Sequence, residues 1–451
     1  MSERSKTAKL TQGPIAPLII KMTFPMLIAI GGILVFNLTD TFFVGKLGKN
    51  PLAALTFTFP VVLFFGSLAL GIGTGTSAVV SRAIGEGNHE KVKRLTTDSL
   101  ILILLISVTT VTIGMLTVDF LFSSLGATGE ILDDVKDYMY IWYPGAIFVM
   151  IPMVGNNAIR ATGDTKTPST VMLIAAGVNL VLDPIMIFGW GPFPEMGIRG
   201  AAWATLIARA VTLIAALYIL AFREKMISFR RPAYREILSS FRHILKIGIP
   251  TAVSRILIPV GTGIITKMIA SFGIAAVAAY GVGSRIEFFA LAPVMALSSV
   301  IGPFVGQNAG AEAYTRIRNA VKGSYLFAVF WGLFAYLVLV ILAPYAIQIF
   351  NDDGEVIRIG TEFLWIATSG FAFLGLLTLS GVVLNVLQKP IQSSVLSITQ
   401  MFILYIPMAY FFSLWIGLKG IFIAYASSYL VIGIISRIIA IRVINYNQDE
   451  K

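Results

Sequence analysis

Four polar side chains in the first half of the sequence could bind a small cation. Asp40 lies in the stretch NLTDTFFVG, Asn179 and Asp183 lie in VNLVLDPIM, and Thr205 lies in GAAWAT. Their carboxylate, amide and hydroxyl oxygens would form a hard shell that suits Na⁺. Two carboxylates that lie close together away from water would instead hold a proton, because their like charges repel. The residue types therefore leave H⁺ and Na⁺ open as the bound ion.

The elements that position these residues are helices within a membrane. Of the 451 residues, 57% are hydrophobic and 13% are charged, and the mean hydropathy is +0.84, whereas soluble domains carry about 25% charged residues. Apolar runs of roughly 20 residues, enough to cross a bilayer, recur along the whole length. We predict an all-α integral membrane protein with twelve spans, at residues 18–45, 52–80, 96–122, 134–157, 168–190, 197–222, 244–272, 276–303, 321–348, 360–386, 391–414 and 418–443.

Basic residues indicate the side of the membrane that each loop occupies, because Lys and Arg are retained on the cytoplasmic side. The N-terminal tail, the loop after the second span and the connection after the sixth span are basic, whereas GEILDDVKD and NDDGEV are acidic. We predict that both termini are cytoplasmic, in a prokaryotic cytoplasmic membrane. Residues 223–243 are then a cytoplasmic linker between an N-lobe at 1–222 and a C-lobe at 244–451. These loops also account for the net charge of +11, so we predict no nucleic-acid partner.

The two halves of the sequence repeat one another. TFPMLIAIGGILVFNLTDTFFVGKLG aligns with IGIPTAVSRILIPVGTGIITKMIASFG, which pairs Pro25 with Pro250 and Gly48 with Gly273. Each half has an even number of spans, so both halves keep one orientation and are related by an axis along the membrane normal. We therefore predict two pseudo-symmetric six-helix lobes with the substrate site between them.

The repeat provides an internal control for the four polar residues. The second half has apolar or aromatic side chains at the matching positions: Ile265 for Asp40, Met401 for Asn179, Tyr405 for Asp183 and Tyr425 for Thr205. Counting along the helices places the four residues at a similar depth in the outer half of the lobe. A single buried aspartate could be a hydrogen-bonded anchor between helices, but the second half forms its scaffold without these oxygens. Ionisable groups in spans are costly and mark ion or proton pathways, so we interpret the four residues as a cation site.

Several motifs together resemble the multidrug and toxic compound extrusion (MATE) family, over essentially the whole chain. They are NLTDTFFVGKLG, TGTSAVVSRAIGEGN, NNAIRATGDTKTPS, VNLVLDPIMIFG, GIRGAAWAT and IGPFVGQNAGA. The resemblance implies two six-helix lobes in a V-shaped outward-open state, and export of organic cations in exchange for H⁺ or Na⁺. It also implies that Asp40, Asn179, Asp183 and Thr205 form the ion site of the N-lobe. The stretch LIPVG at 257–261 is apolar where another branch of the family has an acidic residue, which resembles the DinF-like branch.

Ionisable residues also interrupt the spans of the second half. Arg255 and Glu287 both come near the midplane of the membrane when residues are counted along their helices at roughly 1.5 Å each. We predict that they form a buried ion pair, alone or together with Arg285. The sequence leaves open whether this pair anchors the lobe or forms part of the substrate path.

The remaining polar residues indicate few other sites. Asn37, one turn inward of Asp40, and Asn157, at the inner end of the fourth span, are predicted to contact substrate. His89 and His243 have no ligand neighbours and the chain has no cysteine, so we predict no metal site apart from Na⁺. No P-loop is present, and we predict neither enzymatic activity nor a cofactor.

Two functions are compatible with these patterns. The first is an antiporter that exports small organic cations or drugs in exchange for H⁺ or Na⁺. The second is a flippase for a lipid-linked intermediate, which would need a cationic cavity for a pyrophosphate, and Arg255 and Arg285 keep this alternative open. The acidic residues of the first half favour the antiporter. We expect a monomer whose other partners are membrane lipids.

Overall fold

A computed structural model describes residues 8–191, 193–230 and 233–449, except for the side chains of residues 34, 35, 37, 38 and 49. Within these ranges, twelve helical segments are long and apolar enough to cross a membrane. This confirms the prediction of an all-α membrane protein with twelve spans.

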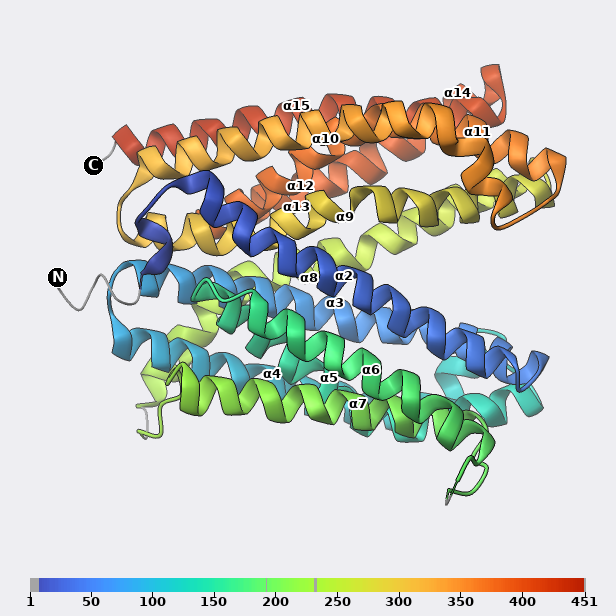
Figure 1. Ribbon diagram of the computed structural model, residues 1–451, viewed down its shortest axis with the longest axis horizontal. Coiled ribbons are helices and arrows are strands. Elements are labelled where there is room, and N and C mark those ends of the chain that lie inside the picture. Colours follow the sequence, from blue (N-terminus) through green and yellow to red (C-terminus); the bar gives the residue numbers. More distant parts are fainter. Residues whose placement is uncertain (1–7, 192, 231–232, 450–451) are drawn as a thin grey trace. The chain divides into compact units, whose positions relative to one another are not determined.

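The first half of the chain supplies six of these segments, drawn in blue to green in Figure 1. They are α2 (Ile15–Gly45), α3 (Lys49–Gly85), α4 (His89–Ser124), α5 (Glu130–Ala161), α6 (Lys166–Phe188) and α7 (Ile198–Tyr218), and π-helical turns at Ile219–Arg223 extend α7. Several helices are longer than the predicted spans at their basic ends. Hydropathy marks only the lipid-facing part of a helix, whereas the backbone hydrogen bonds continue into the aqueous region.

The second half supplies the other six segments, two of which are interrupted. They are α8 (Tyr234–Ala270), α9 (Ile274–Gly310), α10 (Tyr314–Gln348), α11 (Gly354–Ala367) with α12 (Phe371–Val386), α13 (Pro390–Ile398) with α14 (Ile406–Ile416), and α15 (Leu418–Asp449). A 3₁₀ turn joins α11 to α12, and π-helical turns at Thr399–Tyr405 join α13 to α14.

The boundaries of the helices follow the sequence repeat. α3 spans residues 49–85 and α9 spans residues 274–310, so both boundaries are displaced by the same 225 residues that separate Pro25 from Pro250. The glycine before each helix also matches, because Gly48 has a φ of 123° and Gly273 a φ of 112°. Side chains other than glycine rarely adopt such angles. The aligned glycines therefore form the same turn in both halves.

The chain folds as two compact units. The first contains Phe24–Ala252, and the second contains Leu10–Thr23 together with Val253–Lys451. The boundary thus lies inside α8 rather than in the predicted linker at 223–243, and residues 10–23 belong to the second unit rather than to the first. Hydrogen bonds explain the second difference, because Leu10 N donates to Gln307 Oε1 over 3.0 Å and Asn308 Nδ2 donates to Leu10 O over 3.1 Å.

Candidate functional site

Two of the four predicted ion-site residues form a buried pair on α6. Asn179 and Asp183 are both fully buried, and Asn179 Nδ2 donates to Asp183 Oδ1 over 3.0 Å. Residues four apart on a helix lie on the same face, which explains the contact. The bond leaves Asn179 Oδ1 and Asp183 Oδ2 buried without a hydrogen-bonding partner.

Two apolar layers define the level of the site in the first unit. The outer layer packs α2, α6 and α7 together through Val44, Ile187 and Ala201. The inner layer packs the same three helices through Phe36, Ala176 and Ala208. Asp40 and Thr205 each lie three or four residues from both layers, and on α6 Asn179 lies three residues from the inner layer and Asp183 four residues from the outer layer, so all four residues lie between the layers. The structure thus places the four residues at the common depth that helix counting predicts.

Asp40 and Thr205 add further unpaired oxygens at this level. Asp40 Oδ1 and Thr205 Oγ1 are buried and have no hydrogen-bonding partner, and Thr205 is only 8% exposed. Asp40 also interacts electrostatically with Asp183 across the helices. These interactions bring Asp40, Asn179 and Asp183 together, and Thr205 lies at the same level on α7.

Two further residues belong to this cluster and were not predicted from the sequence. Tyr138 of α5 is buried and interacts electrostatically with Asp40, Asp183 and Arg209. The guanidinium of Arg209 on α7 lies 4.4 Å from the ring centre of Phe36 and interacts with Asp40. Arg209 has a sequence signal, since it is a charged residue inside the span predicted at 197–222, four residues after Thr205. Tyr138 has none, because nothing in its sequence context separates it from other membrane tyrosines.

The matching positions of the second unit also gather, but in an apolar core. Ile265, Met401, Tyr405 and Tyr425 are all less than 10% exposed and belong to one hydrophobic cluster. Their shared cluster shows that the sequence repeat aligns positions that are structurally equivalent. The second unit therefore packs this region mainly with apolar and aromatic groups, and at the four matching positions it leaves the Tyr405 hydroxyl without a hydrogen-bonding partner, whereas the first unit leaves four oxygens without partners.

The predicted ion pair of the second half is not formed among the described residues. Neither Arg255 nor Arg285 lies within salt-bridge distance of Glu287, and both arginines are on exposed faces of α8 and α9. The Glu287 carboxylate instead accepts a hydrogen bond from the Tyr425 hydroxyl. It also interacts electrostatically with Tyr429. The direction in which each side chain points depends on the rotation of its helix, which counting residues along the helix does not determine.

Of the two residues predicted to contact substrate, the structure describes the side chain of Asn157 but not that of Asn37. The side chain of Asn37 lies outside the described residues. Asn157 is half-buried on α5, and its Nδ2 donates to the carbonyl oxygen of Met153 over 2.7 Å. Its role in substrate contact stays a prediction.

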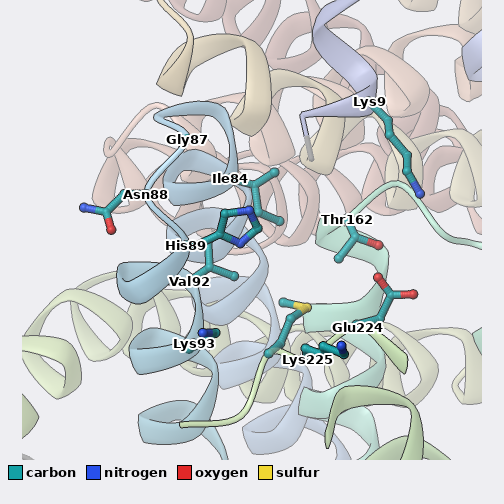
Figure 2. Close-up of a pocket in the computed structure, with 11 residues that line it drawn as sticks. Lys9, Ile84, Gly87, Asn88, His89, Val92, Lys93, Thr162, Glu224 and Lys225 are labelled. Atoms are coloured by element: carbon teal, nitrogen blue, oxygen red, sulfur yellow. The ribbon is translucent and has the colours of Figure 1, made fainter. Parts of the chain in front are cut away.

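A separate cavity of about 160 Å³ lies at the end of α3 that contains Ile84, and Figure 2 shows the side chains that line it. Its lining comes from the turn between α3 and α4, the end of α5 and the segment after α7, and it includes Lys9, His89, Lys93 and Lys225. Asp40 is close to the start of α3, whereas Ile84 in the cavity wall is at its end. About 50 Å of helix separates the two ends of α3, so this cavity is not part of the polar cluster.

The polar cluster has the composition and the unpaired atoms that a small cation requires. Buried polar atoms without partners are rare in folded proteins, and here Asp40, Asn179, Asp183 and Thr205 each contribute one oxygen of this kind. Carboxylate, amide and hydroxyl oxygens fit Na⁺, and a carboxylate oxygen alone fits H⁺. The arrangement can therefore take up a cation inside a membrane-spanning unit.

Comparison with known proteins agrees with this architecture. The MatE family model matches residues 25–185 and 250–411, and its two matches begin at Pro25 and Pro250, the prolines that the sequence repeat aligns. The chain is 36% identical to a protein of Shewanella oneidensis named FAD transporter, over 96% of each chain. It is 27% identical to the multidrug export protein MepA of Staphylococcus haemolyticus, over 80% of this chain and 81% of that protein.

A solved structure shows the same fold over nearly the full length. The Vibrio cholerae MATE transporter VcmN, in its bent form, superposes with a TM-score of 0.90 and 29% identity, covering 99% of both chains. The family match covers well over half of this chain, and the relative from Shewanella oneidensis exceeds 30% identity over nearly all of it. The chain therefore belongs to the MATE family, and it is a multi-pass membrane transporter rather than an enzyme.

Proposed function

We propose that this transporter exports small organic cations in exchange for H⁺ or Na⁺, and that the inorganic cation binds among Asp40, Asn179, Asp183 and Thr205. One observation carries the proposal. The first unit buries four oxygens without partners at one level, two of them from carboxylates, whereas the second unit has uncharged side chains at the equivalent positions, with one unpaired hydroxyl on Tyr405. A scaffold role would require the oxygens in both units, so a ligand is the better explanation.

The charge of the cluster explains how binding of one cation can oppose binding of another. Asp40 and Asp183 attract positive charge, and a bound H⁺ or Na⁺ reduces that attraction for a positively charged cargo. Exchange requires that the inward-facing and outward-facing states differ in affinity for each ligand. The cluster lies where α2, α6 and α7 pack, so a change in the packing of these helices would change the affinity for the cation.

Transport by purified protein in liposomes tests the proposal. A pH gradient and a Na⁺ gradient are imposed separately, and efflux of ethidium is followed by fluorescence. We expect one of the two gradients to drive efflux, and we expect Asp40→Asn and Asp183→Asn each to abolish it. Asp119→Asn is the matched control, because Asp119 is a largely exposed carboxylate that pairs with Lys136 on the surface. Ethidium efflux that responds to neither gradient, or that persists in both aspartate variants, would contradict the proposal.

A flavin dinucleotide is a second candidate for the cargo. The relative named FAD transporter is 36% identical over 96% of both chains. FAD is an anion, and the second unit carries Arg255, Lys267 and Arg285 on exposed faces of its helices, which offers positive charge within the membrane spans. Liposomes loaded with FAD or with ethidium discriminate the two, since FAD release without ethidium release would support the anionic cargo. The cation site of the first unit is tested separately by the aspartate variants.

We also propose a topology and an assembly. The proposed location is a prokaryotic cytoplasmic membrane with both termini in the cytoplasm. The basic loops support the cytoplasmic termini, and the even number of membrane-capable segments among the described residues is consistent with termini on one side. We propose that the protein is a monomer and that its coupling site lies in the N-lobe, as in the DinF-like branch. Reporter fusions at both termini test the topology, and light scattering of the purified protein tests the monomer.

A further inference from the structure

Arg209 introduces a permanent positive charge into the cluster of carboxylates. It lies on α7, four residues and one turn after Thr205, and its guanidinium rests over the Phe36 ring at 4.4 Å. Phe36 in turn lies one turn before Asp40 on α2. The contact with Phe36 brings the guanidinium within electrostatic range of Asp40, although the described residues show no direct salt bridge between the two. Arginine stays protonated in proteins, so this charge is present in every state of the transporter.

Packing of the scaffold does not explain Arg209. The register that pairs Thr205 with Tyr425 pairs Arg209 with Tyr429, an uncharged residue that packs against the hydrophobic cluster of the second unit and interacts electrostatically with Glu287. The equivalent helix position is therefore occupied without any charge. Moreover, Arg209 Nε is buried and has no hydrogen-bonding partner, so the guanidinium is not saturated by fixed protein groups. A structural anchor would be expected to satisfy its donors.

The four ionisable groups at this level come from four helices. They are Asp40 of α2, Tyr138 of α5, Asp183 of α6 and Arg209 of α7. Tyr138 stays neutral under ordinary conditions, so the charge is set by two carboxylates and one guanidinium. Two ionised carboxylates and one guanidinium leave a single negative charge. A single monovalent cation neutralises the cluster, whereas two would be needed if the arginine were absent.

We propose that Arg209 is the resident counter-ion of Asp40, so that the site binds one H⁺ or one Na⁺ rather than two, with Asp183 as the carboxylate that receives it. The inference rests on the proposed function, because it concerns the number of coupling cations. Asp183 suits the receiving role, since its Oδ2 is buried and unpaired while its Oδ1 accepts from Asn179. Arg209 interacts with Asp40 and Tyr138, which leaves Asp183 available.

Charge-balanced variants give an unusual expectation. Asp40→Asn removes one of the two carboxylates while Arg209 stays, so the cluster as a whole carries no net charge and its affinity for a cation falls by at least about tenfold. The double variant Asp40→Asn with Arg209→Gln restores the single negative charge, and cation binding returns. Arg209→Gln alone leaves two carboxylates without a counter-ion, and the protein then binds two cations.

The experiment counts cations on the purified full-length protein. Proton uptake after a pH jump and Na⁺ binding by calorimetry are measured relative to the Asp40→Asn, Asp183→Asn double variant. We expect one cation for the wild type and for Arg209→Lys, none for Asp40→Asn, one for Asp40→Asn with Arg209→Gln, and two for Arg209→Gln. Arg199→Gln is the matched control on the same helix, because Arg199 pairs with Asp137 on the surface over 2.6 Å, and we expect one cation there.

The outcomes separate this inference from the function on which it rests. A wild type that binds neither H⁺ nor Na⁺ would overturn the proposed function itself. A wild type that binds a cation, while the charge-balanced double variant behaves as Asp40→Asn does, would overturn only the role of Arg209. Binding of two cations by Arg209→Lys would also overturn only the role of Arg209. If Arg209→Gln alone fails to fold, the comparison of Asp40→Asn with the charge-balanced double variant still tests whether Arg209 is the counter-ion.

Discussion

Gly200 allows α7 to pack directly on the backbone of α6 beside the polar cluster. A methyl group at this position would stand 2.8 Å from the nitrogen of Ile187 and closer still to the carbonyl of Met186. Met186 is three residues from Asp183 on the same helix. The Gly200→Ala substitution therefore forces apart the two helices that carry Asp183 and Thr205.

The size of the effect follows from the contact. Ordinary van der Waals contact begins at 3.4 Å, so the 2.8 Å approach requires a separation of at least about 0.6 Å. Overpacking of this kind costs about 1–3 kcal/mol of unfolding free energy. Binding sites require their groups within about 0.5 Å of the productive geometry, so we expect the cation affinity to fall by about tenfold, or about 1.4 kcal/mol.

The second unit contains a matched control. A methyl group on Gly420 would stand 2.8 Å from the nitrogen of Ser413 and closer still to the carbonyl of Phe412. Gly420 is the position that the sequence repeat aligns with Gly200, and its helix α15 packs on α14. Gly420→Ala thus imposes the same steric penalty on a unit that has an apolar core in place of the polar cluster.

Thermal unfolding and Na⁺ or H⁺ binding are measured for both variants in detergent. We expect similar losses of thermal stability for Gly200→Ala and Gly420→Ala, but weaker cation binding for Gly200→Ala alone. If Gly420→Ala weakens cation binding as strongly, or if Gly200→Ala is destabilised yet binds as the wild type does, the assignment of the site to the first unit is wrong.

Two further substitutions test contacts of single side chains. Asn179→Leu removes both the amide group that donates to Asp183 and one candidate ligand oxygen, so calorimetry should show that cation affinity is reduced about tenfold or more. Asn157→Leu is the control and should bind the cation as the wild type does. Equal cation binding by the two variants would refute the role of Asn179. Tyr425→Phe removes the hydroxyl that donates to Glu287, which should lower the unfolding free energy by about 1–3 kcal/mol. An unchanged melting temperature for Tyr425→Phe would show that Glu287 does not depend on this donor.

Much of the fold follows from the sequence because the bilayer imposes strong rules. Backbone groups in lipid must pair within a segment, so long apolar runs form helices, and the twelve predicted spans correspond to twelve membrane-capable segments. The repeat was visible at Pro25 and Pro250, and Gly48 and Gly273 share the positive φ that only glycine adopts easily. The same alignment isolated Asp40 and Asp183 by showing that their counterparts are uncharged.

By itself, the sequence determined the membrane class, the number of spans, the two repeated halves and the similar depth of four polar residues. These features depend on the length, hydropathy and order of segments along the chain, which the sequence contains in full. Only the tertiary structure decided which side chains meet across helices. In the structure, Arg209 and Tyr138 interact with the carboxylates of the polar cluster. The Glu287 carboxylate accepts a hydrogen bond from Tyr425 and, in the part of the chain that the structure describes, forms no ion pair with Arg255. The physical reason is that a side chain's direction depends on how its helix is rotated and packed against its neighbours, and that rotation is fixed by the whole bundle.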